Sequence, residues 1–346
     1  MELKELKIAV LGTGANGAAL GADMIRAGLD VTFIDQWPQN VEAMRANGLV
    51  VKFPDGTVET TKIDALHLCQ IAELKVPFDI VFISVKSYDT RWSVELIKPT
   101  LHDKSVVVGL QNGMTMDDVA DIVGPTRTVG AVLGIAANMF EPGIVNRQVY
   151  RSGTWITVGN YSCAGISRLD EVKGALSYAA NTVISEDIWS SKWMKLIANI
   201  PEMLPSAILN VPLLSAVQVD GVRAVMDEAS REAYNLACKL GVTMLPIFGK
   251  TAEEVPTSSQ YALDLLDAVL ESYSLPDTRV AVLQDWDKGR RAELDAFNGY
   301  VVEQCWRRND RAPVNEAILR LAERIEAGEL SPSLNNAELL VAAGRA

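Results

Sequence analysis

The stretch LKIAVLGTGANG at residues 6–17 decides the fold of this chain. An apolar run typical of a buried strand ends at the first glycine, and a helical pattern follows. The motif consists of Gly12, Thr13, Gly14, Ala15, Asn16 and Gly17. Its first glycine permits a tight turn, its second lets a pyrophosphate approach the backbone, and its third lets helix and strand pack closely. We therefore predict a dinucleotide site, with a purely structural glycine turn as the alternative.

Further apolar runs alternate with helical patterns up to about residue 159. Those in the earlier part are nearly continuous in apolar residues, as in strands buried on both faces. The predicted strands after the first cover residues 30–35, 79–86, 105–111, 128–134 and 154–159. This alternation predicts an α/β domain with a parallel sheet covered by helices, and the Gly/Pro-punctuated residues 139–155 suggest a hairpin beside it.

Helical patterns dominate the second half of the chain. They cover residues 190–200, 217–241, 260–273, 278–309 and 315–328. We place the domain boundary near Asp187. The prediction is an α/β dinucleotide-binding domain over 1–187, an all-helical substrate domain over 188–330, and a tail over 331–346 that forms a surface segment or a short docked helix.

Composition excludes several classes of function. The formal net charge is −12, which argues against nucleic acid and anionic membranes as partners. Only two histidines and four well-separated cysteines are present, so most histidine-based catalysis, metal sites and disulfide frameworks are not expected. We find no secretory signal pattern and no apolar run of about 18 residues. We expect a cytoplasmic protein that takes a small-molecule substrate.

Three predicted strand ends carry polar side chains that point to a cofactor. Asp35 stands where an acidic residue accepts hydrogen bonds from the adenosine ribose, and its charge would repel the 2′-phosphate of NADP. NAD is therefore favoured, although Arg45 is a distant candidate for NADP binding and Asp35 could be a solvated strand end. Lys86 and Asn112 follow two further strands, at the edge where ligands of such sheets lie.

The second domain offers a lysine for proton transfer. Lys195 and Asn199 lie one turn apart on one face of the helix predicted over 190–200, beside apolar neighbours. Desolvation lowers the pKa of a lysine and suits it to donate a proton, although a single helical lysine is more often solvated. Prolines 201 and 205 are expected to disturb this helix. Glu293 is expected on the helix over 278–309, where in isolation it would be an ion-pair partner.

Six segments together resemble the ketopantoate reductase (2-dehydropantoate 2-reductase) family. In chain order they read GTGANG, VKSYDT, LQNGMT, WMKLIANI, LQDWDKGRRAELDAFNG and APVNEAI, within residues 6–326. The resemblance implies a Rossmann domain joined to an all-helical domain of the 6-phosphogluconate-dehydrogenase-like type, with the active site between them. It also implies that Lys195 is the general acid/base, that Glu293 binds a substrate hydroxyl, that Asn199 contacts substrate, and that Lys86 and Asn112 line the nicotinamide site.

The chain departs from the family pattern at substrate contacts. Met203 and Leu213 stand where the family has asparagines, and Val280 and Ala281 replace a serine pair. Loss of such polar contacts argues for a larger or more apolar substrate than ketopantoate. Asp35 also replaces the basic residue of NADP-using members, and residues 240–273 exceed the family minimum.

The resulting expectation is an NAD-dependent dehydrogenase or reductase acting on CH–OH donors. It would interconvert a secondary alcohol, either a 2-hydroxy acid or a larger and more apolar alcohol, with its ketone. One alternative is an NAD(P)H-dependent 2-dehydropantoate 2-reductase of pantothenate biosynthesis, and another is a non-catalytic dinucleotide-sensing protein. The sequence leaves open the substrate, the direction of the reaction, the use of NADP and the formation of a homodimer.

Overall fold

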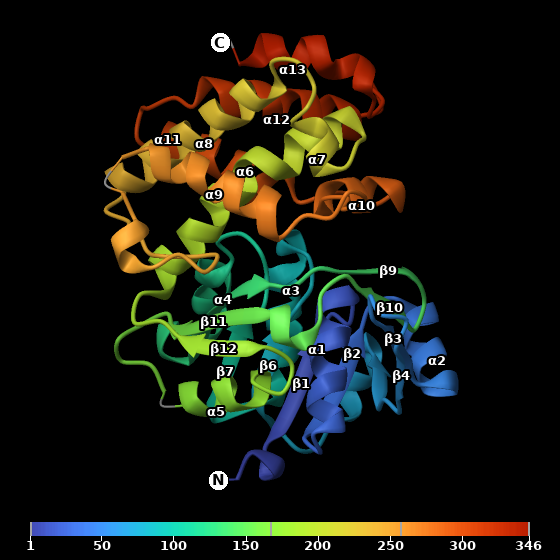
Figure 1. Cartoon of the computed structure of the whole chain (residues 1–346). Helices are drawn as coiled ribbons and strands as arrows, with labels where there is room; N and C mark the ends of the chain where they lie inside the picture. The colour runs from blue at the N-terminus through green and yellow to red at the C-terminus, as the bar shows by residue number, and fades with distance from the viewer. Residues whose placement is uncertain (1, 167, 257, 345–346) are drawn as a thin grey trace. The chain divides into compact units, whose positions relative to one another are not determined.

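The computed structural model describes residues 2–166, 168–256 and 258–344, and the chain divides into two compact units, Met1–Trp189 and Ser190–Ala346 (Figure 1). The strands of the first unit are β1 Lys7–Leu11, β2 Asp30–Asp35, β3 Leu49–Lys52, β4 Val58–Thr61, β5 Ala65–His67, β6 Phe78–Ile83, β7 Leu101–Gly109, β8 Thr128–Gly134, β9 Ala137–Glu141, β10 Ile144–Arg147, β11 Trp155–Asn160 and β12 Asn181–Ile184. Its helices are α1 Ala15–Arg26, α2 Pro38–Asn47, α3 Thr90–Ile97, α4 Met116–Val123 and α5 Leu169–Leu176.

The main sheet of the first unit has the order β12-β11-β8-β7-β6-β1-β2-β5. Its neighbouring strands run parallel, except that β8 and β11 are antiparallel. This confirms the predicted parallel sheet. The chain leaves β1 toward β2 and later returns to the other side of β1 as β6, so the strand order reverses at the carboxyl end of β1, where α/β folds bind ligands.

Alternating side chains of the strands build two cores, one on each face of this sheet. Ile8 and Val10 pack in the cluster that includes residues of α1 and α5. Ala9 and Leu11 alternate with these residues along β1 and pack in the cluster that includes residues of α3 and α4. Because successive strand residues point to opposite faces, a continuous apolar run is what a sheet covered on both sides requires.

A second sheet in the first unit was not predicted apart from its hairpin. Its order is β4-β3-β10-β9, and the hairpin β9–β10 turns at Gly143, which has φ +73°. The hairpin prediction over 139–155 was therefore right in kind but too long, because residue 155 already begins β11. Strands such as β4, VETT, are short and polar and give no apolar signal.

The second unit is helical, and its first helix begins two residues before the unit does. The helices are α6 Ile188–Leu209, α7 Leu213–Ala216, α8 Val222–Lys239, α9 Gln260–Ser272, α10 Ala281–Asp287, α11 Asn298–Trp306, α12 Pro313–Glu326 and α13 Ala337–Ala343. The expected all-helical second half is confirmed. Part of the predicted tail forms α13, and the Asn336 amide before it donates to the Ile208 carbonyl at 3.0 Å, so this segment is docked.

Two details of the helical unit differ from prediction. Helix α6 continues through Pro201 and Pro205, because its residues 196–209 are buried and packing offsets the missing backbone donors. The helix predicted over 278–309 is instead broken: Gly289 follows α10 with φ +62°, a conformation that ends helices, and α11 starts only at residue 298. None of the helices in the described residues is long and apolar enough to cross a membrane.

Candidate active site

The glycine motif forms a loop shaped for a ligand at the start of α1. Gly12 has φ +92°, and a Cβ there would lie 2.6 Å from the Val85 backbone nitrogen. A Cβ at Gly17 would lie 2.4 Å from the Gly12 carbonyl oxygen. Around Gly14, by contrast, no non-neighbouring atom of the described chain lies within 4 Å of a Cβ position. Two glycines are thus needed for packing, and the third leaves open space at a helix N-terminus, as a pyrophosphate requires.

Helix α1 offers its N-terminus without a competing acid. Gly14 is the N-cap, and within the described residues no side chain caps this end and no acid occupies its first turn. Ala15 and Asn16 open the helix and are half-buried. The unpaired N–H groups and the helix dipole favour an anion at this position. The loop therefore fits the phosphates of a dinucleotide.

Asp35 is tied to the same loop. It is 6% exposed, and its Oδ2 accepts hydrogen bonds from the Thr13 backbone N–H at 2.6 Å and the Thr13 hydroxyl at 2.5 Å. Its Oδ1 accepts one from the Trp37 N–H at 2.7 Å and keeps a lone pair. The carboxylate thus fixes the glycine loop, a role that the sequence did not indicate, and ribose contact by Asp35 stays a prediction.

Lys86 and Asn112 emerge at the same edge of the sheet. In the pairing of β6 with β7, Ile83 lies opposite Gly109, and the two predicted residues each follow three positions later. Both side chains are half-buried. The carboxyl ends of β6 and β1 lie side by side, because these strands are also neighbours. The two residues are therefore placed where the nicotinamide end of a cofactor is expected.

Gln111 joins the loops that carry these two residues. Its Nε2 donates to the Val85 carbonyl at 2.7 Å and contacts the Thr90 hydroxyl at 2.9 Å. Gln111 is buried, so its bonds hold the ends of β6 and β7 at a fixed spacing. Gln111 was not predicted as a site residue, because a glutamine next to an asparagine forms no motif that indicates such a role.

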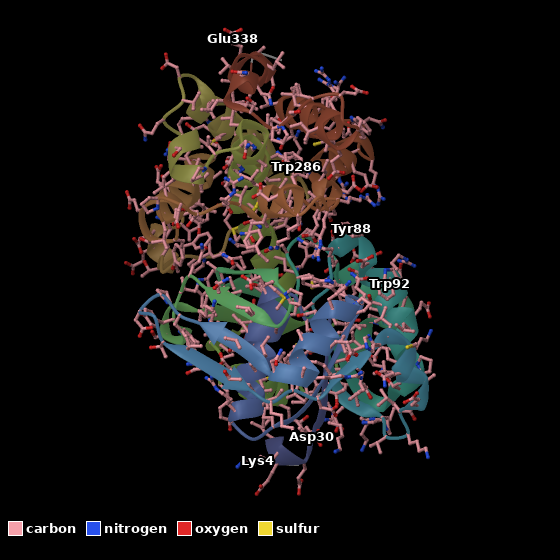
Figure 2. The ribbon with its side chains drawn as sticks, turned by 90° about the vertical axis from the view of Figure 1, so that its right-hand side faces the viewer. Lys4, Asp30, Tyr88, Trp92, Trp286 and Glu338 are labelled. Atoms are coloured by element: carbon pink, nitrogen blue, oxygen red, sulfur yellow. The ribbon has the colours of Figure 1, made fainter. Side chains whose placement is uncertain are left out.

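A second carboxylate lies beside the end of β2. The Gln36 amide donates to Asp89 at 3.1 Å, and the Trp92 indole N–H donates to the same carboxylate at 2.7 Å. Figure 2 shows Tyr88 and Trp92 at the end of the first unit opposite to Asp30, which begins β2. Asp89 therefore adds negative charge near the residue that follows Asp35.

A polar stripe runs along α6. Lys192, Lys195, Asn199 and Glu202 follow one another at spacings of three and four residues, so they lie along one helix face. The amide of Asn199 is fully buried, and Lys192 and Glu202 are 4% and 6% exposed. Neither Lys192 nor Glu202 was predicted, although their helical spacing from Lys195 was readable.

Burial sets the protonation of this stripe. It lowers the pKa of Lys195, and the Glu202 carboxylate partly opposes that shift. It raises the pKa of Glu202 to about 7, against the attraction of the Lys195 charge. It also lowers the pKa of Lys192 to about 7. A lysine with a lowered pKa next to a carboxyl group is suited to exchange protons near neutral pH.

Asn199 is a buried amide without a satisfied partner. Its Nδ2 and Oδ1 make no hydrogen bond to any described residue. Asn298, another buried asparagine of this unit, donates to Asn315 Oδ1 at 2.8 Å. A buried polar group without partners is costly, so an amide left open on the stripe of Lys195 indicates a ligand-binding position.

Glu293 does not lie where we predicted it. It is 7% exposed and precedes the short 3-10 helix Leu294–Ala296, in the break between α10 and α11, so the prediction that it lies on a helix over 278–309 is wrong. Helix α11, which follows Glu293 in the chain, packs on α6, and the rings of Tyr300 on α11 and Trp193 on α6 lie 5.7 Å apart. Glu293 thus belongs to a segment attached to the lysine helix.

The three predicted pocket residues have different surroundings. Met203 lies on α6 and is 8% exposed. Leu213 begins α7, and its N–H donates to the Thr278 carbonyl at 3.3 Å, three residues before Ala281 begins α10. The structure therefore brings the Leu213 and Ala281 segments together and places Met203 one turn after Asn199.

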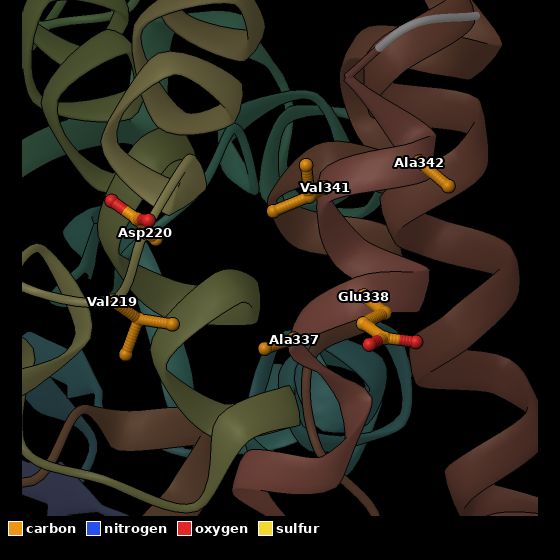
Figure 3. A pocket seen from close by; sticks show the side chains of 6 residues that line it. All are labelled: Val219, Asp220, Ala337, Glu338, Val341 and Ala342. Carbon is orange, nitrogen blue, oxygen red and sulfur yellow. The ribbon is translucent and has the colours of Figure 1, made fainter.

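A cavity of about 420 Å³ lies elsewhere in the helical unit, between α13 and the segment before α8 (Figure 3). Its lining residues are Val219, Asp220, Ala337, Glu338, Val341 and Ala342. It contains none of the predicted catalytic residues. Over the described ranges, no group of three or more His, Cys, Asp or Glu side chains could hold a metal ion.

Comparison with known proteins decides the family. The family model described as "Ketopantoate reductase PanE/ApbA" matches residues 8–162, and "Ketopantoate reductase PanE/ApbA C terminal" matches residues 187–326. The chain belongs to the ketopantoate reductase family. The members of this family are oxidoreductases that act on CH–OH groups and bind a nicotinamide dinucleotide, so the predicted family, fold and enzyme class are confirmed at that level.

Three relatives show how far this ketopantoate reductase-like chain has diverged. A 2-dehydropantoate 2-reductase of Pyrococcus horikoshii is 27% identical over 93% of this chain and 98% of its own length. The crystal structure of a PanE/ApbA family ketopantoate reductase from Ralstonia eutropha JMP134 has a TM-score of 0.79 at 27% identity, covering 94% and 99% of the two chains. D-mandelate dehydrogenase with NADH and anilino(oxo)acetate has a TM-score of 0.82 at 19% identity, covering 93% and 99%, which is a likeness of fold.

Proposed function

We propose that this protein is an NAD(H)-dependent oxidoreductase that interconverts a secondary alcohol and its ketone, with Lys195 as the general acid/base. The observation that carries the proposal is the stripe on α6, where Lys195 has a lowered pKa and lies one turn from the open amide of Asn199. The family supplies the reaction class, and the glycine loop supplies a fitting cradle for the cofactor phosphates.

The glycine loop would hold the phosphates of the cofactor, and the bound nicotinamide would supply the hydride for reduction of a carbonyl carbon or accept it in oxidation of the alcohol. In reduction, the Lys195 ammonium donates a proton to the carbonyl oxygen, which becomes the hydroxyl, and Lys195 recovers its proton from solvent. In oxidation, neutral Lys195 accepts the hydroxyl proton. Asn199 binds the substrate oxygen through its unpaired amide, and Glu293 accepts a hydrogen bond from a substrate hydroxyl. The interaction of Lys195 with the substrate oxygen is strongest in the transition state, where negative charge develops on that oxygen.

Cofactor choice follows from the charges at the end of β2. Asp35 is bonded to the glycine loop and Asp89 is bonded to Gln36, so two carboxylates lie near the end of β2, where folds of this kind bind the adenosine ribose. Like charges repel, and this favours NAD over NADP. Lys86 and Asn112 are proposed to line the nicotinamide end, because Lys86 follows β6, the neighbour of β1, and Asn112 follows β7, the next strand of the sheet.

Reduction of 2-dehydropantoate is a second candidate, because that is the name of the Pyrococcus horikoshii relative. Met203, Leu213 and Ala281 argue against it, since apolar groups cannot bind its polar parts. The polar stripe disfavours the non-catalytic alternative. The unpaired amide of Asn199 and the lowered pKa of Lys195 both destabilise the folded protein or its charged form, and a catalytic site accounts for both. Residence in the cytoplasm and a homodimer stay predictions.

Lys195→Ala and Lys195→Met test the proposal. Secondary alcohols and 2-hydroxy acids with NAD, and the matching ketones with NADH, are followed by NADH absorbance in the wild type and both variants. We expect kcat to fall about 10²–10⁴-fold in the variants while NADH affinity is kept. Lys104→Met, an exposed lysine, is the control. Equal turnover in the wild type and the Lys195 variants would reject the role of Lys195, and 2-dehydropantoate as the best substrate would favour the second candidate.

A further inference from the structure

We propose that Phe248 is the specificity residue of the lysine site and selects substrates that carry an aromatic or flat unsaturated group next to the reacting carbonyl. The proposal rests on the proposed function of Lys195. The Lys195 ammonium nitrogen lies 5.0 Å from the centroid of the Phe248 ring. A cation at that distance from an aromatic face is attracted to the ring. The proton donor of the site is therefore in contact with an aromatic surface.

A second ring supports the first. Phe248 and Tyr273 have centroids 5.0 Å apart with an interplanar angle of 54°, a tilted ring contact. The two rings come from the segment 240–273, which is expected from the sequence to exceed the family minimum. This segment places the Phe248 ring next to Lys195 and the Tyr273 ring against Phe248.

Hydrogen bonds fix the segment that carries Phe248. The Thr243 N–H donates to the Ser190 hydroxyl at 3.0 Å, close to the start of α6. The buried Tyr261 hydroxyl donates to the Leu245 carbonyl at 2.7 Å, and this ties the segment to α9. The segment that carries the ring is therefore tied by hydrogen bonds to the lysine helix α6 and to α9.

The backbone at Phe248 is in an uncommon conformation. Phe248 has φ 57° and Gly249 has φ 78°, inside a turn closed by a hydrogen bond from the Lys250 N–H to the Ile247 carbonyl at 3.2 Å. Two successive left-handed residues are typical of turns that prefer Asn-Gly, and a bulky aromatic residue there is rare. Residues in such conformations concentrate at functional sites, and this supports a functional role for the Phe248 ring.

The position of the ring limits what a substrate can carry. A carbonyl oxygen that accepts a hydrogen bond from Lys195 lies about 2.8–3.0 Å from its nitrogen, so a substituent that points from the carbonyl carbon toward Phe248 meets a ring centred 5.0 Å from that nitrogen. A substituent bearing a hydroxyl would leave that group unpaired against the ring, whereas a planar aromatic substituent can stack or meet it edge-on. Met203, eight residues after Lys195 on the same helix, is a further apolar side chain of α6.

The test is the ratio of kcat/KM for phenylglyoxylate to kcat/KM for 3-methyl-2-oxobutanoate, measured with NADH. We expect the wild type to prefer phenylglyoxylate, Phe248→Leu to lower the ratio about 10–100-fold, and Phe248→Tyr, which keeps a ring, to preserve it. Phe140→Leu, at an exposed phenylalanine of β9, is the matched control. A ratio unchanged in Phe248→Leu, with turnover of both acids retained, would overturn the inference and leave the proposed function intact.

Calorimetry separates the two proposals. N-phenyloxamate and oxamate resemble the two kinds of acid but cannot be reduced at their amide carbonyl, so their binding to the full chain with NADH needs no chemistry. If no ketone is turned over but Phe248→Leu weakens N-phenyloxamate about tenfold more than oxamate, the proposed function fails and the selecting role of Phe248 stands. If there is neither turnover nor a Phe248-dependent difference in binding, both proposals fail.

Discussion

The carboxylate of Asp35 accepts hydrogen bonds from both the backbone N–H and the hydroxyl of Thr13, at 2.6 and 2.5 Å. The end of β2 and the glycine loop are therefore one hydrogen-bonded structure. An acidic residue in this place is usually explained by the ribose alone, but here it also positions the backbone that meets the phosphates. A change at Asp35 should consequently affect the loop and the cofactor together.

We expect Asp35→Ala to lower the free energy of unfolding by about 1–3 kcal/mol, because buried donors of the loop lose their acceptor. The same change should weaken NADH binding and narrow the gap between NADH and NADPH, since one of two repelling charges is removed. Denaturant unfolding and fluorescence titration with both cofactors measure these effects. Thr13→Val removes only the hydroxyl bond, and it should lower stability without changing the preference between cofactors. Tighter NADPH than NADH binding by the wild type would contradict our account of Asp35.

The glycine loop and the positions of the central strands could be predicted because each depends on local patterns. A continuous apolar run followed by glycines specifies a buried strand and a tight turn wherever it occurs. The strand β2 was predicted with its observed limits, 30–35. The short polar strands of the second sheet depend instead on partners far along the chain, such as the pairing of β3 with β10, and local pattern carries no trace of that.

The candidate site was less predictable, because its chemistry depends on burial. Lys192 and Glu202 look like ordinary helical charges until their exposure is known. Glu293 was placed on a helix because its segment has a helical pattern, whereas Gly289 takes a positive φ just after α10 and the helix ends there. Phe248 gave no signal at all, because its contact with Lys195 joins residues 53 positions apart.

Asn199→Leu should make the protein more stable and less active. The leucine has nearly the shape of the amide and removes two buried polar atoms that lack partners in the described structure, so the free energy of unfolding should rise by about 1–3 kcal/mol. The kcat/KM should fall at least tenfold if the amide binds substrate. Thermal unfolding and steady-state kinetics give both numbers. Asn315→Leu is the matched control: that buried asparagine is bonded to Asn298 and Glu232, so its loss should destabilise the protein.

Lys192→Met should raise stability near neutral pH by a few kcal/mol. Burial lowers the pKa of Lys192 from 10.5 to about 7, so between these values the unfolded chain binds more protons than the folded one. The free energy of unfolding of the wild type should therefore rise with pH from about 7 to about 10.5. Below pH 7 the buried amine is charged, and the folded protein is destabilised by the full free energy of burying that charge. The variant should lack this slope. Denaturant unfolding from pH 6 to 10 measures it, with Lys104→Met as an exposed control, and equal slopes in the wild type and Lys192→Met would refute the prediction.

Glu202→Gln should move the pH profile of ketone reduction. Burial lowers the pKa of Lys195, and the Glu202 carboxylate opposes this shift, so removal of the negative charge should lower the pKa of Lys195 further. Reduction needs protonated Lys195, and kcat/KM should therefore begin to decline at a lower pH in the variant than in the wild type. Glu202 also affects stability, because burial raises its pKa from 4.5 to about 7. Between these two values the folded wild type binds more protons than the unfolded chain. Its free energy of unfolding should therefore fall as the pH rises from about 4.5 to about 7. The variant should escape that loss. Glu303→Gln, at an exposed position of α11, should leave both profiles where they are; if Glu202→Gln does the same, Glu202 does not act on Lys195.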